Sequence, residues 1–314
     1  MGRPRRLLTT RAEAGWFAGV EFHAQRLQAV GVDFSGNAAA TVAAPLPFGT
    51  SAAYVIETIL SSVTKLAESM HGPLLSVGLG VPGLVDPQNG VGIHYVFIRD
   101  WNQVPVAEKV RAGLKVPVIL QNNLRAIALA ERWFGMGHEL NDFVILGPRS
   151  GFGVAIMHEG RLVNGSHHAA GEVGRWRWPL GGGLANSEEL HHELSASATW
   201  RRLAGKDADA KIPADLRAAL AEFENASGPV WQAVCADFAR VIGCMHLLLD
   251  PEVFILHGPL TVLGRRFCED IIAAAEAIYP ALAETTLKVV PSLLEDDAGA
   301  LGAASLAMES WLPE

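Results

Sequence analysis

The chain has 314 residues, of which 50% are hydrophobic and 18% charged, and its net charge is −8. This composition indicates a folded globular protein long enough for two domains, and it excludes a disordered chain. The negative charge argues against a nucleic-acid-binding surface over the whole protein.

The chain shows neither a targeting signal nor a membrane span. No apolar stretch reaches the ~18 uncharged residues of a span, and the N-terminus lacks the apolar core of a signal peptide. The cysteines, Cys235, Cys244 and Cys268, are odd in number and scattered. Such a set is typical of core thiols in a reducing compartment. We therefore expect a cytoplasmic protein with no membrane partner.

The first half of the chain predicts a β-meander followed by alternating helices and strands. Val55, Ile59 and Val63 recur at helical spacing after a cap at Ser51. Apolar runs bounded by turn residues predict the strands. The predicted strands cover residues 16–22, 26–33, 38–46, 74–81 and 116–120, and the predicted helices cover residues 50–70, 104–114 and 124–134.

The second half repeats this plan from Asp142 onward. A second meander is followed by helical patterns and single strands. The predicted strands cover residues 142–148, 150–160, 161–165, 251–260 and 286–292, and the predicted helices cover residues 229–249, 263–278 and 296–311. Two such halves predict an α/β fold with two domains around a central cleft.

One strand–helix junction carries amides. The strand over 116–120 ends in Gln121, Asn122 and Asn123, and a helix follows directly. Such junctions are where α/β proteins place ligand-binding groups. Amides donate and accept hydrogen bonds but take no proton at neutral pH. The junction therefore predicts recognition rather than proton transfer.

Five segments in order resemble the ROK family, which contains sugar kinases and sugar-responsive repressors. They are "GLGVPGLVDPQNG", "VPVILQNNLRAIALAE", "HEGRLVNGSHHAAGEVG", "DPEVFILHGPL" and "DDAGALGAASLA". The resemblance runs from about Gly15 to Met308 and implies two actin-like, ribonuclease-H-like α/β domains. It implies a small domain of residues 15–121 plus 297–314 and a large domain of residues 122–296.

The sequence departs from the family's kinases at the catalytic position. Those kinases carry E-N-D-x-N, whose Asp accepts the proton of the sugar hydroxyl, and Asn123 stands at that position. An amide cannot act as the base, and the loss of a base costs about 10²–10⁴ in rate. This substitution predicts no catalytic residue, a pseudokinase rather than an enzyme.

The family's nucleotide loops are also altered. The first, D-x-G-G-T, corresponds to residues 21–25, which contain no glycine, and the adenosine-side Gly-Gly corresponds to His257-Gly258. The second, G-T-G-x-G, corresponds to residues 149–153, where Gly151 and Gly153 could equally form a hairpin turn. Backbone N–H groups approach phosphate closely only where side chains are small, so these changes argue against ATP binding.

The family's zinc ligands are replaced as well. Arg175 stands at the position of the ligand His, and the segment after it contains no cysteine. His191 and His192 are adjacent and diverge on a helix, so we expect them to be solvated. We predict no structural zinc and no other cofactor.

The resemblance implies a sugar pocket lined by Gly83, Asn122, Asn123, Glu172 and Arg175. Asn122, Asn123 and Glu172 would bind sugar hydroxyls, and Gly83 would let the pocket wall approach. Arg175 suggests an acidic sugar or sugar phosphate as the ligand. The alternative is that Arg175 simply pairs with Glu172, three residues before it.

Residues 1–14 form a basic arm that resembles the end of a winged-helix wing in family repressors. Arg3, Arg5, Arg6 and Arg11 could touch a minor groove, or the arm could be a solvated tail. No helix-turn-helix precedes the arm in this sequence. DNA binding is therefore expected only if such a module is supplied upstream or by a partner.

We interpret the chain as the catalytically silent, sugar-sensing body of a ROK transcriptional regulator, with a homodimer as the default assembly. The alternative is a ROK ATP-dependent sugar kinase with a degenerate site that uses another carboxylate, Glu21 or Glu172. A third reading is a scaffold whose pocket is filled by Arg175, Trp176 and Trp178.

Overall fold

The computed structural model describes residues 10–178 and 188–311, which divide into two compact units. The first unit comprises Met1–Ala130 and Asp297–Glu314, and the second comprises Glu131–Asp296. Residues 1–9 of the predicted basic arm, with Arg3, Arg5 and Arg6, lie outside the described residues. The chain thus leaves the first unit inside helix α3 (Asn123–Phe134) and returns to it just before helix α9 (Ala298–Ser310).

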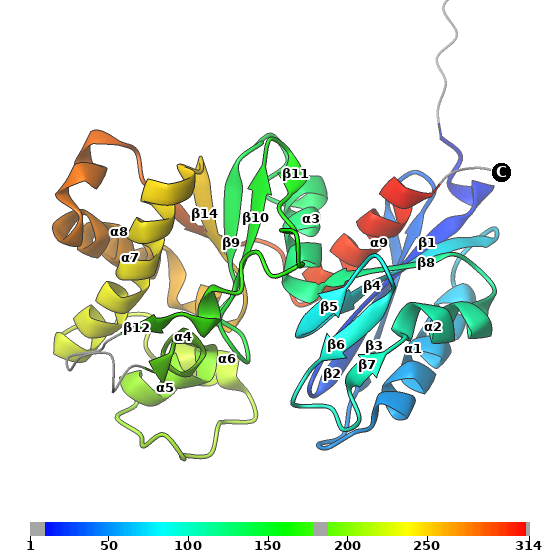
Figure 1. Ribbon diagram of the computed structural model, residues 1–314, viewed down its shortest axis with the longest axis horizontal. Helices are drawn as coiled ribbons and strands as arrows, with labels where there is room; N and C mark the ends of the chain where they lie inside the picture. Colours follow the sequence, from blue (N-terminus) through cyan, green and yellow to red (C-terminus); the bar gives the residue numbers. More distant parts are fainter. Residues whose placement is uncertain (1–9, 179–187, 312–314) are drawn as a thin grey trace, which may run out of the picture. The chain divides into compact units, whose positions relative to one another are not determined.

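The first unit is built on a five-stranded sheet with the order β3-β2-β1-β4-β8 (Figure 1). β1, β2 and β3 are antiparallel, as the predicted meander requires, and β4 and β8 continue the sheet parallel to β1. A small sheet, β5-β6-β7, follows β4 in the chain. The elements are β1 (Trp16–His23), β2 (Arg26–Asp33), β3 (Ala38–Pro45), α1 (Ala52–Ala67), β4 (Leu74–Val81), β5 (Leu84–Asp86), β6 (Val91–His94), β7 (Asn102–Val104), α2 (Val106–Leu114) and β8 (Val118–Asn122).

The second unit repeats this sheet. Its order, β11-β10-β9-β14-β15, again has an antiparallel meander followed by two parallel strands. The elements are β9 (Phe143–Leu146), β10 (Val154–His158), β11 (Arg161–Leu162), β12 (Arg177–Trp178), β13 (Glu188–Glu189), α4 (Leu190–Leu194), α5 (Ala196–Leu203), α6 (Leu216–Ala221), α7 (Pro229–Leu249), β14 (Val253–Leu256), α8 (Gly264–Ile278) and β15 (Val289–Pro291). The predicted α/β fold with a doubled plan is confirmed.

Helix α9 packs on the first sheet through residues without side chains. A Cβ on Gly78 of β4 would come 1.7 Å from the Ala303 carbonyl oxygen, and one on Gly19 of β1 would come 1.9 Å from the Ala300 carbonyl oxygen. The helix surface and the sheet surface therefore meet backbone to backbone. On the other side of the sheet, α1 begins at the predicted cap, where Ser51 Oγ accepts from Tyr54 N at 3.3 Å.

The core of the second unit is aromatic. Phe238 of α7 lies between Phe152 and Phe267, with ring centroids 5.9 and 5.5 Å apart. By length and composition α7 could cross a membrane, but 50% of its apolar window is buried inside the unit. Burial of this kind is what a core helix requires.

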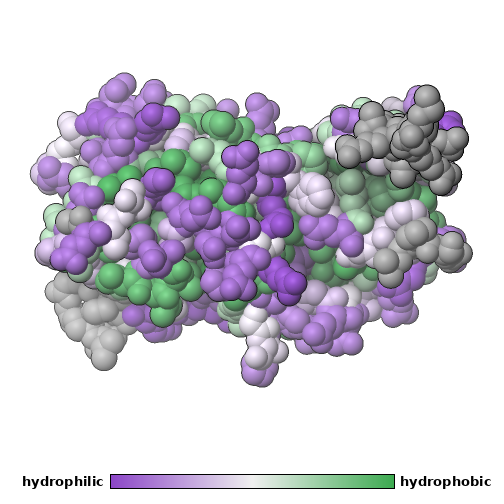
Figure 2. Space-filling view, turned by 90° about the horizontal axis from the view of Figure 1, so that it is seen from above, coloured by the Kyte–Doolittle hydropathy of each residue, from purple (hydrophilic) through white to green (hydrophobic). Residues whose placement is uncertain are grey.

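The surface mixes polar and apolar side chains, as Figure 2 shows for one face. Exposed hydrophobic residues of the first unit include Phe48, Val96 and Phe97. Cys235 and Cys268 are buried, and burial raises the pKa of each thiol to about 12. These two thiols are therefore protonated and unreactive at neutral pH.

Candidate functional site

Asn122 is held by its own chain at the start of α3. Its Oδ1 accepts from the backbone N–H of Leu124 at 2.9 Å and of Arg125 at 3.3 Å, and its Nδ2 donates to the Gly83 carbonyl oxygen at 3.0 Å. The first two bonds satisfy N–H groups that a helix N-terminus leaves unpaired. Asn122 therefore fixes the junction and ties it to the turn at Gly83.

Gly83 is required by the backbone of that turn. Its φ is +74°, a left-handed conformation that side chains disfavour, and a Cβ would come 2.3 Å from the His94 carbonyl oxygen. The space beside Gly83 is thus occupied by the chain itself. The turn brings a carbonyl oxygen to Asn122.

Asn123 contacts a buried carboxylate. Its Nδ2 donates to Glu21 Oε1 at 3.1 Å, although 102 positions separate the two residues, and Glu21 is only 1% exposed. Strand register explains the contact: Glu21 of β1 pairs with Gly80 of β4, which pairs with Gln121 of β8. Because Gly80 lacks a side chain, the Glu21 side chain packs against it on the way to Asn123.

A buried arginine belongs to the same junction. Arg125 is 3% exposed, and its Nη1 donates to Gln121 Oε1 at 3.4 Å. Gln121 Oε1 also accepts from the backbone N–H of Asn122 at 2.8 Å. The junction therefore combines amides with a buried carboxylate and a buried guanidinium, and it is richer than the three amides suggested.

In the second unit, residues 147–153 connect β9 to β10 as a hairpin. Gly147 N donates to Gly153 O at 2.9 Å, and Arg149 N donates to Gly151 O at 2.8 Å. Among the residues that the structure describes, none accepts the N–H groups of Ser150, Gly151 or Gly153. The segment is a turn, as one alternative held, and its free N–H groups suit an oxyanion.

Glu172 and Arg175 form an ion pair close to this hairpin. Arg175 Nε lies 3.5 Å from Glu172 Oε2, and the two side chains are 59% and 28% exposed, respectively. The segment that carries the ion pair is held to the start of β10, because Val154 N donates to Gly171 O at 3.0 Å. The pairing alternative is thus present in the structure. Of the residues in the scaffold alternative, Trp176 is 37% exposed, and the side chain of Trp178 lies outside what the structure describes.

His191 was expected to be solvated, and this expectation is wrong. Its Nδ1 accepts from the backbone N–H of Phe152 at 2.9 Å. The ring lies against Gly151 and Gly174, where a Cβ would come within 2.7 and 2.3 Å of ring atoms. Burial lowers the pKa of His191, whereas Glu172 and Glu189 raise it. Its neighbour His192 is exposed, and the pattern "LHHEL" does not show which histidine turns inward.

His257 belongs to a buried polar cluster. Its Nδ1 lies 3.3 Å from Ser292 Oγ, and Ser292 Oγ donates to Glu131 Oε1. Burial raises the pKa of Glu131, although Ser292 and the Met136 N–H counteract it. Because the only hydroxyl proton of Ser292 goes to the carboxylate, His257 must donate from Nδ1. The cluster joins α3 to the residues that directly follow β14 and β15, and no sequence pattern indicates it.

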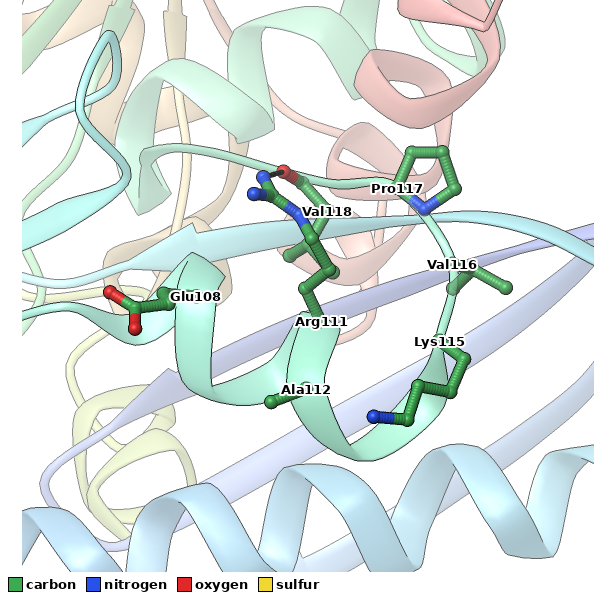
Figure 3. A pocket seen from close by; sticks show the side chains of 7 residues that line it. All are labelled: Glu108, Arg111, Ala112, Lys115, Val116, Pro117 and Val118. Carbon is green, nitrogen blue, oxygen red and sulfur yellow. Dashed lines mark hydrogen bonds between the residues drawn. The ribbon is translucent and has the colours of Figure 1, made fainter.

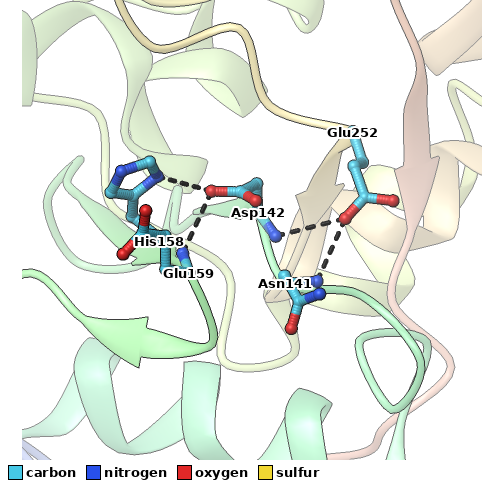
Figure 4. A network of polar contacts seen from close by, with 5 residues as sticks. All are labelled: Asn141, Asp142, His158, Glu159 and Glu252. Atoms are coloured by element: carbon cyan, nitrogen blue, oxygen red, sulfur yellow. Dashed lines mark hydrogen bonds and ion pairs between the residues drawn. The ribbon is translucent and has the colours of Figure 1, made fainter.

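A second polar cluster surrounds the start of β9 (Figure 4). Asp142 Oδ1 accepts from His158 Nδ1 at 2.5 Å and from the Glu159 N–H, and these contacts lower the pKa of Asp142. Glu252 Oε1 accepts from the N–H groups of Asn141 and Asp142. Within the described ranges, no three His, Cys, Asp or Glu side chains are placed to hold a metal ion. The absence of zinc stays a prediction.

A surface cavity of about 670 Å³ lies elsewhere, at the C-terminal end of α2 (Figure 3). Arg111 and Lys115 border it, and Arg111 Nη2 donates to the Val118 carbonyl oxygen at 3.4 Å. Cations at a helix C-terminus are stabilised by the carbonyl groups there. None of the five predicted site residues lines this cavity.

Comparison with known proteins gives both kinases and regulators. The chain is 27% identical over 276 residues to a glucokinase of Thermotoga maritima, covering 81% of this chain and 85% of the relative. It is 24% identical to the transcriptional dual regulator NagC of Escherichia coli K12, covering 89% of this chain and 72% of the relative. The structure of a Streptomyces griseus ROK glucokinase with glucose and AMPPNP superposes with a TM-score of 0.78 at 23% identity, covering 94% and 100% of the two chains.

These similarities overturn one prediction. The substitution of Asn123 predicted a pseudokinase, but the match to a glucokinase over 85% of its length points to an enzyme. The physical reason for the error lies in the first unit, where the amide at position 123 does not stand alone. The structure places the carboxylate of Glu21 in contact with that residue.

The ROK family model matches residues 17–310, nearly the whole chain. The five segments that suggested the family therefore belong to a match that spans both units. Relatives of both kinds, a glucokinase and a transcriptional dual regulator, match most of this chain. On this evidence the chain belongs to the ROK family.

Proposed function

We propose that this protein is a sugar kinase of the ROK family in which Glu21 replaces the missing aspartate as the general base. The observation that carries the proposal is the hydrogen bond from Asn123 Nδ2 to Glu21 Oε1 at 3.1 Å. It places a carboxylate beside the residue that stands at the family's catalytic position. Similarity to glucokinases supports phosphoryl transfer as the reaction.

The two side chains have separate roles in this proposal. Asn123 donates from Nδ2 to Glu21, which leaves Oδ1 as an acceptor for a sugar hydroxyl. Glu21 then accepts the proton of the hydroxyl as its oxygen attacks the terminal phosphoryl group of a nucleoside triphosphate. The bond from Asn123 keeps one carboxylate oxygen in place, so less reorientation is needed during transfer.

The second unit supplies donors for negative charge. The unpaired N–H groups in the β9–β10 hairpin, at Ser150, Gly151 and Gly153 among the described residues, suit phosphate oxygens. The half-exposed Arg175 suits an acidic group on the sugar, which keeps an acidic sugar or a sugar phosphate as the proposed substrate class.

A coupled assay for ADP release tests the proposal. The panel contains neutral hexoses, sugar acids and sugar phosphates, each with MgATP. We expect sugar-dependent release by the wild type and a loss of about 10²–10⁴ in kcat for Glu21→Gln. Glu108→Gln, the same change at an exposed position of α2, should be unaffected.

Two outcomes would contradict the proposal. One is the absence of ADP release with every sugar, and the other is full activity of Glu21→Gln. Because Glu21 is buried, its variant needs a folding check, for which the thermal midpoint with and without sugar is suitable.

A second function, a sugar-sensing regulator, is favoured by one specific observation: the similarity to NagC over 89% of this chain. Such a protein would bind sugar as a homodimer and would bind DNA only with a helix-turn-helix supplied upstream or by a partner. A rise in thermal midpoint with a sugar, together with no ADP release and a dimer in light scattering, would favour this function over the kinase.

A further inference from the structure

His191 is seated by glycines on two different segments. The imidazole lies against Gly151 of the β9–β10 hairpin and against Gly174, which lies between Glu172 and Arg175. A Cβ on Gly174 would come 2.3 Å from His191 Cε1 and 2.0 Å from the Phe152 carbonyl oxygen. The ring position thus depends on both segments lacking side chains there.

The contact with Phe152 specifies the protonation state of His191. A backbone N–H can only donate, so Nδ1 must be an unprotonated acceptor at 2.9 Å. The ring is then neutral, with its proton on Nε2. Burial favours the neutral ring, and so do the cation of Arg175 and the neighbouring His192, whereas Glu172 and Glu189 oppose it.

The hydrogen bond anchors one peptide of the hairpin. The Phe152 side chain is 1% exposed and packs on Phe238, so it is fixed from the core side, and His191 fixes its N–H from the other side. The neighbouring peptides of Ser150, Gly151 and Gly153 keep their N–H groups for a ligand. Because the Phe152 peptide is fixed by His191, the neighbouring peptides are held in one orientation, and so are their N–H groups.

The same histidine is tied to the Glu172–Arg175 segment. Leu190, the residue before it, donates its N–H to the Trp176 carbonyl oxygen at 3.0 Å. Through its ring and its backbone, the start of α4 therefore links the hairpin to the segment that carries the ion pair.

We propose that His191 is a positioning residue, whose Nδ1 holds the Phe152 peptide so that the hairpin presents its free N–H groups to the phosphates of a nucleotide. This inference rests on the proposed kinase function. It assigns His191 no contact with substrate, and its action is transmitted through the backbone of residues 150–153.

The test compares two replacements of His191. His191→Asn keeps an acceptor close to the position of Nδ1, and His191→Leu keeps bulk without an acceptor. His192→Leu, one position away and exposed, is the matched control. The first readout is hydrogen exchange of the Phe152 amide. We expect protection to fall about tenfold in the leucine variant and to be mostly restored in the asparagine variant.

The second readout separates nucleotide from sugar. In the assay for ADP release, His191→Leu should raise KM for MgATP at least about threefold and leave KM for the sugar unchanged. The His191→Asn variant should have a KM for MgATP close to that of wild type. Equal values for the leucine and asparagine variants, or unchanged Phe152 protection in His191→Leu, would overturn the inference.

Failure of the kinase proposal is recognised separately. If no sugar supports ADP release, the shift in thermal midpoint caused by MgATP alone replaces KM as the readout. A shift that is lost in His191→Leu and kept in His191→Asn supports the inference without any activity. A shift that is the same in both variants overturns it.

Discussion

The two units share a strand order, but the polar residues that the sequence singled out as a site are held differently in them. In the first unit, Glu21, Gln121 and Arg125 are buried in the sheet–helix junction and bonded to backbone and side chains. In the second unit, Glu172 and Arg175 are partly exposed and paired mainly with each other. Buried polar groups depend on their partners, whereas exposed ion pairs contribute little to stability. Substitutions should therefore have unequal consequences in the two places.

The largest effect on stability is expected from Asn123→Leu. This change removes the amide that donates to Glu21 and leaves a buried carboxylate with one donor fewer. The free energy of unfolding should fall by about 1–3 kcal/mol, as measured by urea denaturation. A decrease smaller than about 0.5 kcal/mol would show that the first unit tolerates loss of a buried partner, and the contrast would fail.

Asn122→Ala should come next. It removes the acceptor for two N–H groups at the start of α3, and loss of a helix cap costs about 1 kcal/mol. Ser51→Ala, at the cap of α1, is the matched comparison. Because Asn122 also donates to Gly83 O, its substitution should cost more than that of Ser51. Equal costs would mean that the Gly83 bond contributes nothing measurable.

The contribution of His191 to stability should depend on pH. The pKa of His191 is lower in the folded protein than its ordinary value of 6.5. Below pH 6.5 the unfolded state therefore binds more protons than the folded state, and wild type loses stability as the pH falls. The difference in stability between wild type and His191→Leu should be largest above pH 6.5 and should shrink below it. Thermal midpoints between pH 8 and about 5 measure this difference. A constant difference would contradict the neutral ring.

The smallest effect is expected from Arg175→Ala. Its guanidinium is 59% exposed, so loss of the ion pair should change the free energy of unfolding by less than about 0.5 kcal/mol. Its effect on ligand choice should be larger, with any preference for sugar acids over neutral sugars lost. Unchanged preference in the ADP-release assay would remove the acidic-sugar hypothesis.

Much of the fold could be predicted from periodicity. The helical pattern over 229–249 coincides with α7, and the two meanders gave the doubled sheet. The contact between Glu21 and Asn123 could not be predicted in this way, because it depends on β4 lying between β1 and β8. A parallel strand order is a property of tertiary structure, and local pattern does not carry it.

The role of His191 escaped for a different reason. Two adjacent histidines on a short helix look alike in sequence, and only the glycines at 151 and 174 select the one that turns inward. Gly151 and Gly174 lie 40 and 17 positions before His191 in the chain. The two glycines make room for the ring, but the sequence alone does not show that their segments lie next to His191.

The double crossing of the chain between the units affects how synthesis relates to folding. The second unit is continuous, from Glu131 to Asp296, and can complete its core as soon as it has left the ribosome. The first unit must wait for α9, because Gly19 and Gly78 of its sheet pack against the backbone of that helix. The last segment made thus finishes the part begun first.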